Sequence, residues 1–91
     1  MNLILVSYDF EASPTKRRQL EEYLNEEHDT LWLMRTVYLV HTEMSAAELA
    51  RKIDEIAEDH QIMLCVAEVS GYLKTQGLDH NQREWLEQHG F

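Results

Sequence analysis

The sequence is poor in the residues that build disulfide frameworks, glycine loops and basic surfaces. Its 91 residues include one cysteine, one proline and three glycines, and 17 acidic residues outnumber eight basic ones. The single thiol, Cys65, excludes an internal disulfide and suits a reducing compartment. No nucleotide-binding glycine loop or nucleophile elbow is present. The net charge of −9 disfavours non-specific binding to nucleic acid or anionic membranes, which depends on basic side chains.

Long apolar runs are absent too. The N-terminal run spans only about five residues and lacks a basic flank and a cleavage site, so we expect neither a signal peptide nor a membrane span. We therefore expect the protein to be cytoplasmic. The length fits one domain. Apolar residues make up 44% and charged residues 27%, which is typical of a globular chain rather than a disordered one.

The N-terminal stretch from Asn2 to Phe10 predicts a strand relative to which the other elements can be placed. Its side chains alternate between two faces, Ile4, Val6, Tyr8 and Phe10 on one and Leu3, Leu5, Ser7 and Asp9 on the other. Both sets begin apolar, which is typical of a central strand covered on both sides. The second set turns polar at its end, where Asp9 presents a carboxylate.

Two capping signals predict the main helices. Ser13 followed by Pro14 starts a helix that runs to about Glu27. Ser45 and Glu48 form a capping box that starts a second helix, ending around Asp59–His60. Three- and four-residue spacing predicts the buried side chains Leu20, Tyr23 and Leu24 in the first helix and Leu49, Ile53, Ile56 and Ala57 in the second.

The other segments predict strands and a short terminal helix. Residues 29–42 are rich in β-branched and aromatic side chains, and this run is too long for one typical strand. We therefore divide it near Arg35–Thr36 into an antiparallel pair. The remainder gives a strand over 61–70, a loop over 71–77 and a short helix capped by Asp79 that carries Trp85 and Leu86.

This order of elements predicts an α+β, ferredoxin-like βαββαβ sandwich over residues 1–91, with a C-terminal loop and helix over 76–91. Both main helices lie on one face of the sheet, yet three of the four strands are apolar on both faces. The final helix is too short to cover the second face alone. We therefore expect a two-fold homodimer that packs sheet against sheet and buries on the order of 800 Å² per subunit.

Three stretches carry a family resemblance: the strand end Tyr8–Asp9, residues 36–49 (TVYLVHTEMSAAEL), and residues 64–71 (LCVAEVSG) with the later Gly77–Leu78 and Trp85–Leu86. They resemble the SinR-like members of the superfamily of CRISPR-associated protein 2, to which the VapD toxins are related. The resemblance implies a dimeric ferredoxin-like domain. It also implies that the aspartate closing the first strand meets its dimer mate and holds a divalent metal for phosphodiester cleavage. By position this aspartate is Asp9.

Asp9 is accordingly the first catalytic and metal-binding candidate. Two such carboxylates on a dimer axis repel unless they are protonated or bridged by a cation, and Mg²⁺ or Mn²⁺ suits oxygen ligands and hydrolytic chemistry. We place the first strand parallel to the strand that carries His41, which brings His41 near Asp9 as a general base. The alternative is that Asp9 only forms the turn or faces the dipole of the following helix.

Lys16, Arg17 and Arg18 form the one basic cluster and are the candidates for nucleic-acid binding. Alternatively they pair with acids one helical turn away, Arg17 with Glu21 and Arg18 with Glu22. The five histidines lack the spacing of a zinc motif. Two functions therefore stay open. One is a metal-dependent nuclease of RNA or DNA, or a degenerate relative of one. The other is a non-catalytic dimeric module that binds or regulates a protein partner.

Overall fold

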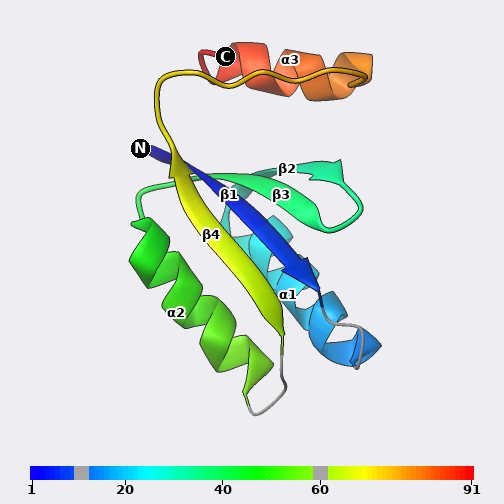
Figure 1. Cartoon of the computed structure of the whole chain (residues 1–91), viewed down its shortest axis with the longest axis vertical. Helices are drawn as coiled ribbons and strands as arrows, with labels where there is room; N and C mark the ends of the chain where they lie inside the picture. Colours follow the sequence, from blue (N-terminus) through cyan, green and yellow to red (C-terminus); the bar gives the residue numbers. More distant parts are fainter. Residues whose placement is uncertain (10–12, 59–61) are drawn as a thin grey trace.

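The computed structural model describes residues 1–9, 13–58 and 62–91 and contains one four-stranded antiparallel sheet (Figure 1). The strand order is β2-β3-β1-β4, the arrangement of a ferredoxin-like α+β fold. Phe10, Asp59, His60 and Gln61, which the sequence places at element ends, lie outside the described residues. The elements are β1 (Asn2–Asp9), α1 (Pro14–Glu27), β2 (Asp29–Met34), β3 (Val37–Thr42), α2 (Ala46–Ala57), β4 (Met63–Val69) and α3 (His80–Gln88).

The predicted capping signals form as hydrogen bonds. The Ser13 hydroxyl accepts from the Lys16 backbone N–H at 3.2 Å, and Ser45 and Glu48 satisfy each other's backbone N–H groups in a complete capping box. Each such cap satisfies N–H groups that have no partner within the helix. α2 ends at Ala57, earlier than expected, and the cap residue Glu58 has a positive φ of 54°.

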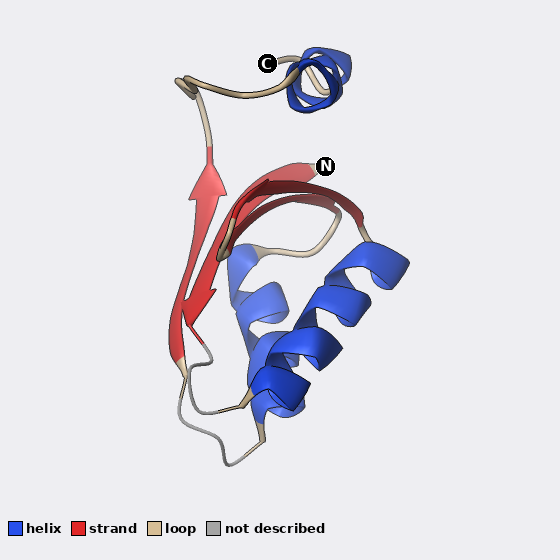
Figure 2. Cartoon of the chain, turned by 90° about the vertical axis from the view of Figure 1, so that its right-hand side faces the viewer, coloured by secondary structure: helices blue, strands red, loops and turns tan. Residues whose placement is uncertain are grey.

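The main core lies between the sheet and the two long helices, α1 and α2, which both pack on one face (Figure 2). Tyr8 and Leu20 belong to this core, as the alternation and the helical spacing predict. Tyr23 and Ile56 are only partly buried at its edge. The fully buried side chains in this core are Ile4, Val6, Leu20, Leu24, Val40, Leu49 and Ile53.

The opposite face of the sheet is covered at one end only. A second cluster of buried side chains, Leu3, Leu31, Leu39 and Leu86, joins that end to α3. We call this end the covered half, and it includes the cross-strand partners Asp29 and His41. Figure 1 shows α3 lying across this end, after a connection from β4 without helix or strand.

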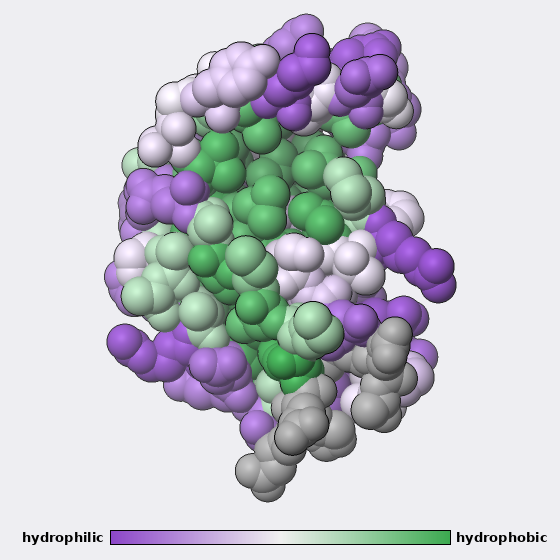
Figure 3. Space-filling model, viewed as in Figure 1, coloured by the Kyte–Doolittle hydropathy of each residue, from purple (hydrophilic) through white to green (hydrophobic). Residues whose placement is uncertain are grey.

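The other end of this face we call the open half, defined by Ser7, Asp9, Met63, Cys65 and Ala67. Met63 is 75% exposed, and Cys65 and Ala67 are exposed too. Figure 3 shows apolar residues gathered over the middle of this face. The prediction that the final helix is too short to cover the whole face is confirmed. Among the described residues, no helix is long and apolar enough to cross a membrane.

Candidate functional site

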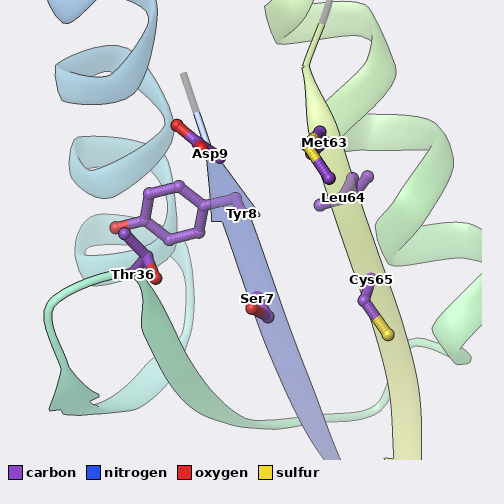
Figure 4. Close-up of a pocket in the computed structure, with 7 residues that line it drawn as sticks. All are labelled: Ser7, Tyr8, Asp9, Thr36, Met63, Leu64 and Cys65. Atoms are coloured by element: carbon purple, nitrogen blue, oxygen red, sulfur yellow. The ribbon is translucent and has the colours of Figure 1, made fainter. Parts of the chain in front are cut away.

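The predicted carboxylate, Asp9, lies at the last residue of β1 in a shallow pocket of about 270 Å³ (Figure 4). Its cross-strand partner is Met63, and the next pair on the same face is Ser7 and Cys65. Asp9 is half-buried. The structure thus places Asp9 at the edge of the exposed apolar strip of the open half. The pocket is lined by Ser7, Tyr8, Asp9, Thr36, Met63, Leu64 and Cys65.

The prediction that His41 lies near Asp9 is wrong. β1 pairs antiparallel with β3, so His41 is opposite Leu3, and Ser7 is opposite Val37. Asp9 and His41 therefore occupy opposite ends of the sheet. The physical reason is the hairpin between β2 and β3, which reverses the chain next to β1 instead of continuing parallel to it. A general base at His41 cannot serve a metal held by Asp9 of the same chain.

The basic cluster at the start of α1 is largely engaged by acids. Lys16 is buried and its Nζ lies 3.2 Å from Glu58 Oε1 on α2. Arg17 lies 3.9 Å from Glu21, the pair that helical spacing predicts. Within the described residues, no ion pair joins Arg18 to Glu22. The cluster therefore offers phosphate a weaker surface than three adjacent cations in the sequence suggest.

Tyr8 shows how this end of the molecule is held on the helical side. Its hydroxyl donates to Glu21 Oε2 at 2.7 Å, and its ring stacks on Tyr38 with centroids 6.3 Å apart. Burial and the bond to the Glu21 carboxylate both raise the pKa of Tyr8. The phenol therefore stays protonated and keeps donating to Glu21, which fixes α1 against the end of β1.

A second group of chemically capable side chains lies in the covered half. Asp29 begins β2, His41 is its cross-strand partner on β3, and His89 follows the end of α3. One ligand-type atom from each residue lies within 4.8 Å of the other two. The His41 and His89 rings meet edge to face with centroids 4.6 Å apart.

Trp85 organises this group. Its indole Nε1 donates to Asp29 Oδ1 at 3.0 Å, its backbone carbonyl accepts from His89 Nδ1 at 2.7 Å, and its ring stacks on the His89 ring at 3.9 Å. His89 Nε2 faces Asp29 Oδ2 at 2.5 Å. Partial burial favours the neutral acid at Asp29, but the bonds from His89 and Trp85 outweigh it and lower the pKa of that carboxyl.

Sequence spacing did not reveal this group. The interval from Asp29 to His41 and the long interval to His89 match no zinc motif, so residue spacing alone does not group these three residues. Hairpin counting gives only part of the register. For a two-residue turn at Arg35–Thr36, Met34 pairs with Val37 and counting outward places Asp29 opposite Thr42. A register shift between Trp32 and Met34 brings Asp29 opposite His41 instead. The position of α3 over that pair had no signal in the sequence.

The comparisons with known proteins add no identification. No family model, curated protein or solved structure matches the chain.

Proposed function

We propose that this chain is a divalent-metal-dependent phosphodiesterase that acts on RNA or DNA as a homodimer. The observation that carries the proposal is the position of Asp9 at the rim of the open half, on the same face as exposed Met63 and Cys65. A second copy packed against this apolar strip hides it from water. The same two-fold contact brings two Asp9 carboxylates toward one axis.

The chemistry follows from the charges that such a contact creates. Two carboxylates approaching each other at a partly dehydrated seam repel, and a hard divalent cation relieves the repulsion. The two Asp9 carboxylates would hold Mg²⁺ or Mn²⁺, and such an ion would supply an activated water and positive charge toward the phosphate oxygens. Asp9 is the metal ligand in this scheme, and Arg18 is the cation of the α1 cluster with no ion pair among the described residues.

The experiment compares the parent with Asp9→Asn in cleavage of labelled RNA, single-stranded DNA and duplex DNA, with Mg²⁺, Mn²⁺ or EDTA. We expect metal-dependent cleavage by the parent and its loss in Asp9→Asn. The matched control is Asp54→Asn, which removes one exposed carboxylate from α2 and leaves cleavage unchanged. Equal cleavage by parent and Asp9→Asn contradicts the proposal.

The dimer is tested separately by sedimentation at several concentrations. Met63→Asp places a charge in the middle of the proposed contact and shifts the equilibrium to monomer. Tyr72→Asp makes the same kind of change at an 83% exposed residue in the connection to α3 and leaves association unchanged. Reaction of the Cys65 thiol with a maleimide slows as concentration rises if the open half is the interface.

A non-catalytic dimeric module that binds a protein partner is the second candidate. It is favoured by the engagement of Lys16 and Arg17 with Glu58 and Glu21, which leaves a surface of net charge −9 with few cations for phosphate. A basic protein surface is the complementary partner. A dimer that cleaves none of the three substrates with either metal, and binds a basic partner with salt-dependent affinity, supports this second function over the first.

A further inference from the structure

We propose that Asp29, His41 and His89 form a binding site for a transition-metal ion of the zinc class, separate from Asp9. The three residues come from β2, β3 and the end of α3, and their candidate ligand atoms lie within 4.8 Å of one another. This site is at the covered half, the opposite end of the sheet from Asp9. It requires neither a second copy of the chain nor nuclease activity.

The hydrogen bonds around His89 prepare it as a ligand. A backbone carbonyl only accepts, so Nδ1 of His89 carries the proton that it donates to the Trp85 oxygen. With Nδ1 protonated, the other ring nitrogen, Nε2, is the one that offers a lone pair once its own proton leaves. In metal-binding histidines, the N–H of the ring nitrogen that does not bind the metal characteristically donates a hydrogen bond to a carbonyl or carboxylate, as Nδ1 of His89 does here. Nε2 already points at Asp29 Oδ2.

Asp29 is oriented by the same residue. The Trp85 indole donates to Oδ1 at 3.0 Å, which leaves Oδ2 directed at His89. The Asp29 side chain is 53% exposed, whereas the His89 side chain is 12% exposed. Solvent therefore reaches the group at Asp29, whereas His89 is largely buried and is held by its contacts with Trp85. An ion at this site would lie between His89 Nε2 and Asp29 Oδ2 in place of their direct contact.

The distances suit a tetrahedral ion. Metal–nitrogen and metal–oxygen bonds of about 2.0–2.2 Å place ligand atoms roughly 3.3 Å apart. The group spans this value, because its closest pair is 2.5 Å apart and all three atoms fall within 4.8 Å. To bind the same ion, His89 Nε2 and Asp29 Oδ2 would have to move apart from their direct contact.

The donor set selects the class of ion. Two imidazole nitrogens and one carboxylate oxygen favour Zn²⁺, Co²⁺ or Ni²⁺ over Mg²⁺ and Ca²⁺, which prefer oxygen. Three protein ligands leave a coordination position for water or an exogenous ligand, as catalytic zinc sites do.

An acidic hollow leads to the group. A surface pocket of about 380 Å³ contains Asp29 and His41 together with Glu27, Glu43 and His28 in its lining. Carboxylates around an entrance raise the local concentration of cations. The hollow therefore provides an entry path for the ion and room for a ligand at the open coordination position.

The test is titration of the parent with Zn²⁺ by calorimetry, with thermal unfolding measured in parallel, on protein free of any affinity tag. We expect one zinc per chain and a melting temperature that rises with zinc, because an ion that binds only the folded chain stabilises it. Asp29→Asn keeps an acceptor for the Trp85 indole and removes the carboxylate ligand. It weakens zinc binding by at least about tenfold, the smallest loss typical even for residues that support metal ligands.

His89→Gln and His41→Gln are the second and third variants, with the same expected loss. His80→Gln is the matched control, because His80 is an exposed histidine on the same helix that pairs with Glu84. It leaves affinity and stoichiometry unchanged. Absence of zinc binding by the parent, or an equal loss in His80→Gln and Asp29→Asn, overturns the proposal. A change in Trp85 emission on adding Ni²⁺, measured in a Trp32→Phe background, reports the site directly.

Discussion

The two halves of the sheet face opposite the long helices differ in what lies over them. In the covered half, Leu86 and Trp85 of α3 shield Leu3, Leu31 and Leu39, and the side chains of Asp29, His41 and His89 gather within one chain. In the open half, Met63 and Cys65 are exposed beside the Asp9 carboxylate. Packing of α3 over one end of the sheet thus also brings His89 next to Asp29 and His41.

The largest expected effect tests the core of the covered half. Leu39→Ala removes a side chain with no exposed surface and leaves a cavity beneath α3. We expect the free energy of unfolding to fall by about 2–5 kcal/mol, the usual cost of such a truncation. Urea denaturation followed by circular dichroism measures it. Met34→Ala, at a 56% exposed residue of β2, is the control and changes stability little.

The next effect concerns how strongly α3 is coupled to the sheet. Asp79→Ala removes the N-cap of α3, and Ser45→Ala removes the equivalent cap of α2. Each costs its helix about 1 kcal/mol. Hydrogen exchange distinguishes them. Faster exchange stays within α3 for Asp79→Ala and spreads to the sheet for Ser45→Ala, because α2 is part of the main core. Spread to the sheet in both variants would mean that α3 and the sheet unfold together.

A smaller effect appears as a pH dependence at the end of α1, next to the covered half. Partial burial lowers the pKa of His28 despite the nearby Glu27 carboxylate, and its Nε2 lies 3.0 Å from the Tyr23 hydroxyl. The unfolded chain therefore binds this proton more readily than the folded one. The stabilisation is complete above the unfolded pKa, about 6.5, and is lost as pH falls from there toward the lower folded value.

His28→Gln isolates that dependence, because glutamine keeps a hydrogen-bonding group near Tyr23 and does not titrate. We expect the melting temperature of the parent to fall more steeply than that of His28→Gln between neutral and mildly acidic pH. Parallel curves for the two proteins would show that His28 does not contribute.

The smallest expected effect is in the open half. Met63→Ala in dilute solution changes the free energy of unfolding by no more than about 0.5 kcal/mol, as for other exposed positions. The same samples are measured by sedimentation at several protein concentrations. If the loss in the free energy of unfolding grows as the protein associates, a second copy covers Met63. A large loss at every concentration would mean that the chain itself buries this residue, and would remove the contrast between the halves.

The fold was predictable because its signals are local. Ser13–Pro14, the Ser45–Glu48 box and the alternation of β1 each specify an element from neighbouring residues, and all three form as expected. The error about His41 came from strand direction. α1 connects β1 to β2, and the hairpin between β2 and β3 then reverses the chain. The direction of β3 relative to β1 depends on both connections, and the alternation of side chains within one strand does not reveal it.

The candidate site in the covered half was harder to predict, because it depends on tertiary docking. Asp29 and His41 meet because the hairpin register shifts between Trp32 and Met34, whereas counting from the turn pairs Asp29 with Thr42. His89 joins them only because Leu86 buries α3 against Leu3, Leu31 and Leu39. Apolar packing sets that position, and no spacing between ligand residues records it.

The connection from β4 to α3 is a segment at which a protease can separate α3 from the sheet. Lys74 lies exposed in this stretch, outside any helix or strand, the kind of segment that proteases nick first. Limited trypsin digestion after Lys74 severs the covalent link to α3 and leaves the seven-residue β4 and both long helices intact. The fragment that carries Trp85 and His89 then stays attached only by its own contacts, so its rate of release measures their strength.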